Sequence, residues 1–351
     1  MKRIFFLCFF IGCLYALECT NSQSLFGFGT LTGLTPVSSS GRRGTLFKSL
    51  KKGVIVGLKF YVGTGDSVMG SFSGGIHNNA YTLLSETVNF PYVSSVGWQT
   101  AQLKKPYVIS SSTEYVVLVN VLGNKKINWK KNSVFYKNFL FMIDTFSYSA
   151  GGYPFTSGVL TAINGVNLQG SPSLNSNKYY KDILFIPTSS VFSTSTPTGS
   201  HITFNNPGDR ELGMVFHTIV SGYIYAIRFY KSSTDTVSAT DHKGRIWDEA
   251  SQNLLAVVSF SLVVSNGWNE QLLLTPLQVT AGTKYIVTVN SKDGSYAENS
   301  AYAYTSDDGN IIAEGTRYAT SFDAFPELKT DTSNHYRDIV FSPCTTSKNK
   351  N

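Results

Sequence analysis

Apolar residues recur at every second position along most of this chain. In the clearest runs these residues are β-branched or aromatic, which is the pattern of half-buried β-strands. Turn-forming clusters, such as those at 63–66 and 307–309, separate the runs. The sequence therefore predicts an all-β protein built from antiparallel β-sandwiches of jelly-roll-like character. The alternating residues of three runs are Val54, Val56, Leu58 and Phe60; Tyr115, Val117 and Val119; and Tyr285, Val287 and Val289.

The two halves of the chain carry the same landmarks in the same order. In the longest match, 9 of 24 positions are identical without a gap. Residues kept in both copies of a duplication serve the shared fold, whereas residues that differ are candidates for a specialised role. The matching segments are 53–61 and 222–230, 97–120 and 267–290, and 180–187 and 336–343.

The start of each repeat is marked by a short motif. Residues 24–26 read Ser-Leu-Phe, and residues 190–192 read Ser-Val-Phe. This places the connection between the repeats within a few residues of Thr188. We predict a first repeat at 24–188, a second repeat at 189–344 and a disordered tail at 345–351.

The N-terminus predicts secretion. Lys2 and Arg3 precede an apolar run that ends at Ala16, and a short basic start before such a run is typical of a signal peptide. The run is shorter than the roughly 20 residues that span a bilayer, and no later segment is apolar enough to predict a transmembrane helix. We expect residues 1–16 to be removed and the protein to be extracellular. A lipid anchor on Cys13 is the alternative interpretation.

Removal of residues 1–16 leaves two cysteines, Cys19 and Cys344, near the two ends of the chain. In an oxidising compartment such a pair is expected to form a disulfide. Two free thiols are the alternative. Neither repeat contains a further cysteine pair, so we expect hydrophobic cores to stabilise both.

Charge is distributed unevenly between the halves. Residues 17–190 carry 15 basic and 6 acidic side chains, and residues 191–351 carry 12 basic and 16 acidic ones. The first half is therefore basic (+9) and the second mildly acidic (−4); together with Lys2 and Arg3 they give the net charge of +7. Such a contrast favours different partners or association between molecules, and neutral drift of surface charge explains it equally well.

The second half resembles the extracellular family called domain of unknown function 4082. The first half is similar but diverged, with His77 opposite Trp247 and Arg42 opposite Glu211. The resemblance implies compact β-sandwiches of the kind found in secreted, modular surface proteins, and it implies no enzymatic activity. The segments that carry it are 211–216, 227–230, 242–247, 253–256, 267–268, 281–285 and 336–341.

Aromatic side chains near loops provide candidate binding residues. Trp247 with His242, and Tyr296, are predicted to form a ligand surface in the second repeat, because binding residues concentrate on loops. Packing of Trp247 at the edge of the sandwich is the competing interpretation. Trp98 and Trp268 follow a glycine at the same place in each repeat. Their rings suit sugar stacking, but retention in both copies favours packing.

A second candidate is the basic segment around Lys125, Lys126 and Trp129. It suits an anionic polysaccharide, an acidic lipid headgroup or a nucleic acid, and secretion makes nucleic acid an unexpected partner. A solvated loop is the alternative.

Two aspartates in the closing strands are candidates for a structural role. Asp182 and Asp338 share a strand face with apolar residues, and a buried carboxylate needs a partner. Calcium held by Glu211 and Asp338, with Asp209 nearby, is one possibility, because Ca²⁺ prefers oxygen ligands. A carboxylate hydrogen-bonded to backbone amides is the other.

The sequence lacks the common catalytic motifs: a Gly-x-Ser-x-Gly nucleophile elbow, a His-Glu-x-x-His metalloprotease motif, a phosphate-binding glycine-rich loop and a zinc-like cysteine spacing. We therefore expect a secreted, non-enzymatic protein that binds a carbohydrate or another component of a cell surface or matrix, without a cofactor other than the calcium considered above. A structural or adhesive protein that acts through protein contacts is the alternative. A glycoside hydrolase, which requires two facing carboxylates, is a third. The ligand and the oligomeric state stay open at this stage.

Overall fold

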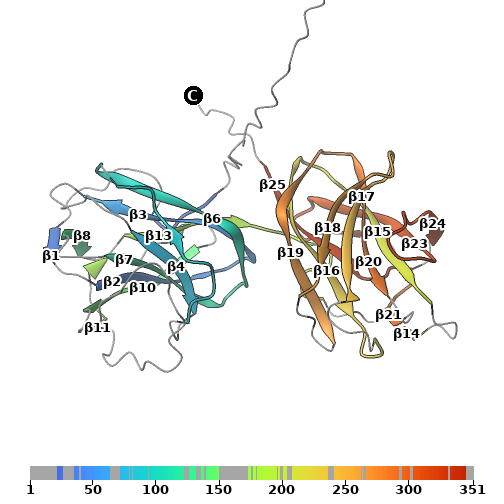
Figure 1. Ribbon diagram of the computed structural model, residues 1–351, viewed down its shortest axis with the longest axis horizontal. Helices are drawn as coiled ribbons and strands as arrows, with labels where there is room; N and C mark the ends of the chain where they lie inside the picture. The colour runs from blue at the N-terminus through green and yellow to red at the C-terminus, as the bar shows by residue number, and fades with distance from the viewer. Residues whose placement is uncertain are drawn as a thin grey trace, which may run out of the picture.

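The protein consists of two all-β repeats that lie side by side in the computed structural model (Figure 1). Every regular element among the described residues is a β-strand, which confirms the predicted fold class. For those described residues that fall within 35–43, 121–178 and 201–203, the structure describes the backbone only. Residues 1–16, the predicted signal peptide, and residues 345–351, the predicted tail, lie outside the described residues. The structure describes residues 22–26, 35–38, 41–63, 72–78, 80, 82–93, 95–121, 126–131, 136–137, 140–149, 173–174, 177–178, 180–195, 197, 201–203, 208–235, 241–261, 263, 266–291, 295–300, 303–330 and 333–344.

The larger sheet of the first repeat has seven strands in the order β11-β10-β2-β7-β4-β5, with β9 paired to β10. All of the strand pairs in this sheet are antiparallel. The strands are β2 (Gly41–Ser49), β4 (Ser73–Asn78), β5 (Val88–Asn89), β7 (Glu114–Val121), β9 (Tyr136–Lys137), β10 (Leu140–Ser149) and β11 (Ser173–Leu174).

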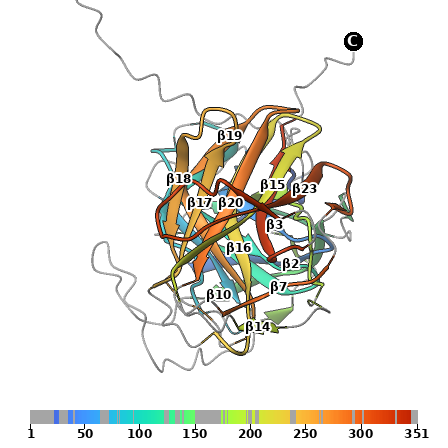
Figure 2. The same ribbon diagram turned by 90° about the vertical axis from the view of Figure 1, so that its right-hand side faces the viewer.

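The second repeat has an equivalent sheet in the order β18-β17-β20-β15-β23-β22, with β24 paired to β23. Figure 2 shows β18, β17, β20, β15 and β23 side by side. The strands are β15 (Arg210–Thr218), β17 (Lys243–Asp248), β18 (Leu254–Ser259), β20 (Lys284–Ser291), β22 (Tyr304–Thr305), β23 (Ile311–Ala319) and β24 (Leu328–Thr330).

A three-stranded sheet packs against each large sheet. Its order is β13-β3-β6 in the first repeat and β25-β16-β19 in the second. Short strands close one end of each repeat, as the sheets β1-β8-β12 and β14-β21. These strands are β3 (Gly53–Val62), β6 (Gly97–Ile109), β13 (Lys181–Pro187), β16 (Gly222–Lys231), β19 (Gly267–Val279), β25 (Arg337–Pro343), β1 (Thr35–Ser38), β8 (Lys126–Lys131), β12 (Asn177–Lys178), β14 (His201–Thr203) and β21 (Ser295–Ala297).

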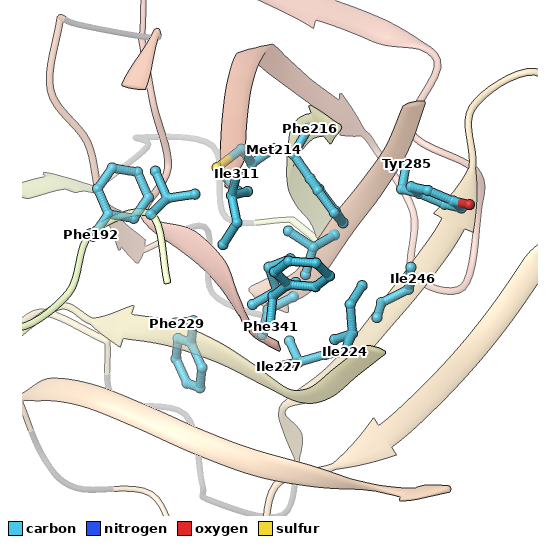
Figure 3. Packing of buried hydrophobic residues seen from close by; sticks show 14 of the residues in the cluster. Phe192, Met214, Phe216, Ile224, Ile227, Phe229, Ile246, Tyr285, Ile311 and Phe341 are labelled. Atoms are coloured by element: carbon cyan, nitrogen blue, oxygen red, sulfur yellow. The ribbon is translucent and has the colours of Figure 1, made fainter. Parts of the chain in front are cut away.

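Each repeat has its own hydrophobic core between its two sheets. In the second repeat Met214 and Phe216 come from the large sheet, and Ile227, Phe229 and Phe341 come from the small sheet (Figure 3). The equivalent strands of the first repeat form a separate core.

Alternation of side chains along a strand explains why Leu58, Phe60 and the alternating residues of the other two runs enter these cores. Val54 lies before a register shift between Ile55 and Gly57, Val56 lies within it, and both pack in a different cluster.

Glycine before the shared tryptophan has a conformational reason. Gly97 and Gly267 begin β6 and β19 with φ angles of 119° and 123°, which L-residues with a side chain rarely adopt. The Gly-Trp step is thus a feature of the fold in both repeats.

The two small sheets pack against each other. Val54 and Ile186 of the first repeat share a buried cluster with Tyr225, Ala226 and Val340 of the second. An ion pair between Lys52 and Glu270 bridges the repeats beside it. Because the equivalent small sheets pack face to face, the short connection at 188–189 joins two repeats that share an interface rather than two independent domains.

Candidate functional site

One buried aspartate in each repeat binds the segment that leads into that repeat. Asp338 accepts hydrogen bonds from the backbone N–H groups of Val191 (2.9 Å), Phe192 (3.1 Å) and Ile339 (2.7 Å). Asp182 does the same in the first repeat, with Leu25 (2.8 Å), Phe26 (3.0 Å) and Ile183 (2.7 Å). The two sites are therefore equivalent structural clamps, as the backbone-amide interpretation predicted.

A cation and a tryptophan complete each clamp. The Arg228 guanidinium lies 3.6 Å from the Asp338 carboxylate and 4.3 Å from the centre of the Trp268 ring. In the first repeat the Lys59 ammonium takes the same place, 3.3 Å from Asp182 and 3.8 Å from the centre of the Trp98 ring. Cation–π contact and packing account for both tryptophans.

Burial and hydrogen bonding act on these carboxyl groups in opposite directions. Burial raises the pKa of Asp338 above its ordinary value, while Arg228 and the three N–H donors favour the charged form. The pKa of Asp182 is raised in the same way and is opposed by Lys59. The amide donors and the cation of each clamp therefore stabilise the fold by compensating a buried charge.

The structure does not bring Glu211 and Asp338 together as a calcium site. Glu211 is fully buried and accepts two hydrogen bonds from Nη1 of Arg245, at 3.0 and 2.9 Å. Asp338 is held by its own clamp. Among the described residues, no three His, Cys, Asp or Glu side chains group as metal ligands would. The calcium prediction on these two residues is therefore corrected to two separate ion pairs.

The second repeat contains a chain of alternating charges that begins at its surface. Asp323 pairs with Nη2 of Arg245, and Nη1 of Arg245 pairs with Glu211. The Asp323 side chain is 66% exposed, whereas that of Arg245 is 3% exposed. Arg245 and Glu211 come from β17 and β15 of the large sheet, while Asp323 comes from the connection between β23 and β24.

The chain of charges continues into the interior through Arg337. The Arg337 guanidinium interacts electrostatically with Glu211 and with Asp235. Asp235 in turn lies 3.5 Å from the Lys231 ammonium and 3.3 Å from Nε2 of His242. Burial lowers the pKa of Arg337 to about 10, so this group stays protonated at neutral pH. We call Asp323, Arg245, Glu211, Arg337, Asp235 and Lys231 the charge network.

The first repeat does not have the residues to build the same network. Gly75 occupies the position of Arg245, Val62 that of Lys231, and Arg42 that of Glu211. Lys181 aligns with Arg337. The residue aligned with Asp235 is Asp66, which lies outside the described residues. Since the fold is shared and the network is not, the network is the leading candidate for a specialised role.

The prediction that Trp247, His242 and Tyr296 form an exposed ligand surface is wrong, because all three side chains are buried. Trp247, His242 and Tyr296 are exposed by only 5%, 0% and 4%. Nε1 of Trp247 donates to Oγ1 of Thr288 at 3.1 Å, and Phe325 packs edge-on against the indole at 5.8 Å.

His242 and Tyr296 are interior for a different reason. The His242 ring packs on Phe229 at 4.9 Å, and the Tyr296 ring packs on His335 at 5.0 Å. These two side chains therefore belong to the polar interior of the repeat. Trp247 lies on the other side of the large sheet and is covered by a loop.

The basic segment forms a strand rather than the loop considered as its alternative. Lys126 and Trp129 belong to β8, where their backbones pair with Ser38 and Thr35 of β1. Lys125 lies outside the described residues, and the binding role of this segment stays a prediction.

Cys344 is disulfide-bonded, as the sequence predicted. Its predicted partner, Cys19, lies outside the described residues.

Sequence reasoning missed Arg245, Asp323 and Phe325. Arg245 carried a usable signal, because it stands two residues before Trp247 and therefore shares its strand face. Asp323 and Phe325 carried none, since they reach this face from a loop more than seventy residues further along the chain.

Comparisons with known proteins agree with the duplication. No helix among the described residues is long and apolar enough to cross a membrane. No curated protein matches the chain. A family model described as "Domain of unknown function (DUF4082)" matches residues 35–180 and again residues 194–337. The chain therefore belongs to this family and contains two tandem copies of its domain.

Proposed function

We propose that this protein is a secreted, non-enzymatic binding protein whose second repeat recognises a carbohydrate or another component of a cell surface or matrix. The observation that carries the proposal is the surface end of the charge network. There Arg245 and Trp247 lie together on one face of the large sheet, beneath a loop. The first repeat has Gly75 and His77 at these positions.

Three physical arguments support this assignment. A guanidinium can donate two parallel hydrogen bonds to a carboxylate or sulfate group. An aromatic ring beside it offers a flat apolar surface on which a sugar ring can stack. Both groups project from a strand in a sheet, which positions side chains more rigidly than a loop does. The interface between the repeats would present this face in a constant orientation.

The decisive experiment is binding of the secreted chain to an array of neutral and acidic glycans, with albumin as the control protein. Binding above albumin that is lost in the Trp247→Ala variant supports the proposal. A variant of the equivalent residue of the first repeat, His77→Ala, should leave binding unchanged. The absence of binding to every glycan would contradict the proposal.

An adhesive role through protein contacts is a second candidate, and a different observation favours it. Strand β18 lies at the edge of its sheet and exposes Leu254 (47%), Leu255 (39%) and Val257 (55%). An exposed apolar edge strand is a template for pairing with another chain. Concentration-dependent light scattering that disappears in a Val257→Lys variant would favour this candidate, and a monomer at all concentrations would contradict it.

A further inference from the structure

We infer that the loop at residues 320–327 is a lid whose Asp323 and Phe325 occupy the site of an acidic sugar, and that the ligand class is a uronic-acid oligosaccharide. This inference rests on the proposed function and names its ligand. Asp323 stands in for the carboxylate of the sugar, and Phe325 stands in for the apolar face of its ring.

The lid covers two side chains of one strand. Asp323 pairs with Nη2 of Arg245, and the Phe325 ring packs edge-on against Trp247. Arg245 and Trp247 are two residues apart on β17, and their backbones pair with Thr288 and Ile286 in unbroken register. Their side chains therefore project from the same face as neighbours, about 7 Å apart.

Removing the lid would uncover a guanidinium beside an indole. Nη1 of the Arg245 guanidinium donates to both carboxylate oxygens of Glu211. Nη2 is therefore the nitrogen that faces the lid. The indole is oriented by the hydrogen bond from its Nε1 to Thr288. A pyranose with a carboxylate on the ring carries the two complementary features, a planar anion and an apolar face, at similar spacing.

The charge balance of the network would allow a ligand carboxylate to replace the carboxylate of Asp323. Arg245, Arg337 and Lys231 supply three positive charges, and the buried anions Glu211 and Asp235 supply two negative charges. Asp323 provides the third negative charge from a side chain that is 66% exposed. A ligand carboxylate would keep the network neutral if it replaced Asp323, whereas a neutral sugar would leave a buried positive charge in excess.

Side-chain contacts hold the lid: besides the Asp323 and Phe325 contacts, Pro326 is buried and Phe322 and Ala324 are half-buried. Within the described part of the chain, the backbone of 320–327 makes no hydrogen bond to a neighbouring strand or loop outside β23 and β24. Asp323 also has a φ of 61°, in the left-handed region that costs free energy for residues other than glycine. The closed position therefore depends on side-chain contacts rather than on backbone hydrogen bonds, and the contacts of Asp323 and Phe325 are the ones that cover Arg245 and Trp247.

The test uses trigalacturonic acid and its methyl ester as probes in isothermal titration calorimetry with the full secreted chain. Asp323→Ala should bind trigalacturonic acid about tenfold more tightly than the unaltered protein, because the competing internal carboxylate is gone. Asp307→Ala removes an exposed acidic side chain from another turn of the same repeat and should leave affinity unchanged. The methyl ester should bind neither variant.

A second substitution tests the role of the guanidinium. Arg245→Lys in the Asp323→Ala background keeps the charge opposite Glu211 but loses the fork, and it should reverse the gain. Three results would each overturn the inference. They are equal affinity of Asp323→Ala and of the double variant for trigalacturonic acid, no gain in affinity in Asp323→Ala over the unaltered protein, and equal affinity for the acid and its methyl ester. If an array shows glycan binding while Asp323→Ala shows no gain for the acid, the proposed function stands and the lid inference fails.

Limited proteolysis of the unaltered protein gives a test that does not depend on a variant folding. Saturating trigalacturonic acid should speed cleavage within 320–327, because the ligand displaces the lid from the sheet. Unchanged or slower cleavage there would overturn the inference.

Discussion

Replacing Asp338 with asparagine tests whether one carboxylate anchors the start of the second repeat. The substitution keeps the shape of the side chain and removes its charge. The amide oxygen can keep the two hydrogen bonds that Oδ1 accepts, from Val191 and Ile339. The amide nitrogen takes the place of Oδ2, which accepts from Phe192 and faces Arg228.

The expected cost follows from these contacts. Loss of a hydrogen bond to a charged group costs about 1.5–3 kcal/mol, and leaving one member of a buried ion pair costs about 3–5 kcal/mol. Arg228 also donates to Ser190 and to the backbone carbonyl of Ser193, and lies 3.8 Å from Glu270. Because these partners remain, we expect the lower end, a decrease of about 3 kcal/mol in the free energy of unfolding.

Urea denaturation followed by tryptophan fluorescence measures this decrease, since Trp268 contacts Arg228. Asp307→Asn, an exposed change in the same repeat, is the control and should cost less than about 0.5 kcal/mol. Arg228→Met combined with Asp338→Asn should recover part of the loss, because it removes the unpaired guanidinium. A loss below about 1 kcal/mol for Asp338→Asn would refute the clamp.

Three further outcomes are expected. Burial and Arg337 lower the pKa of His335 to about 3. The folded state therefore binds fewer protons than the unfolded state below pH 6.5, and the free energy of unfolding falls as the pH falls. His335→Gln should reduce this dependence by about 1.4 kcal/mol per pH unit between pH 6 and pH 4, and an equal pH dependence of both proteins in urea denaturation would contradict it. Val54→Asp buries a carboxylate between the repeats and should split a single calorimetric transition into two; one unchanged transition would show that the interface does not couple them. Lys52→Ala removes the ion pair to Glu270, whose side chains are 32% and 19% exposed, and should cost less than about 1 kcal/mol in chemical denaturation; a loss above about 2 kcal/mol would show a stronger bridge.

The architecture could be read from local patterns. Alternation of apolar residues predicted the strands, because side chains alternate between the faces of a sheet. The repeated landmarks predicted two equivalent domains, and the shared Gly-Trp step reflects a positive φ that only the fold requires. Such features depend on neighbours in the sequence or on comparison of the two copies.

The candidate site could be read only in part. The differences between the copies pointed to Trp247 and Glu211, and the structure places Arg245 next to both residues. Alternation shows that Trp247 and Ile246 face opposite sides of their strand, but it does not show that Phe325 covers one of those sides. The prediction of an exposed surface failed at Trp247 for that reason, and it failed at His242 and Tyr296 because these side chains pack in the interior of the repeat.

The sequence by itself determined the all-β class, the duplication and the strands that form each core, because these follow from periodicity and from repetition. Only the tertiary structure decided the partner of each buried charge. Asp338 binds amides nearly 150 residues earlier in the chain, and Arg245 joins Glu211 to Asp323 across two strands and a loop. Such pairings depend on strand register and loop placement, and a charge buried at one position gives no local signal of the residue that will neutralise it.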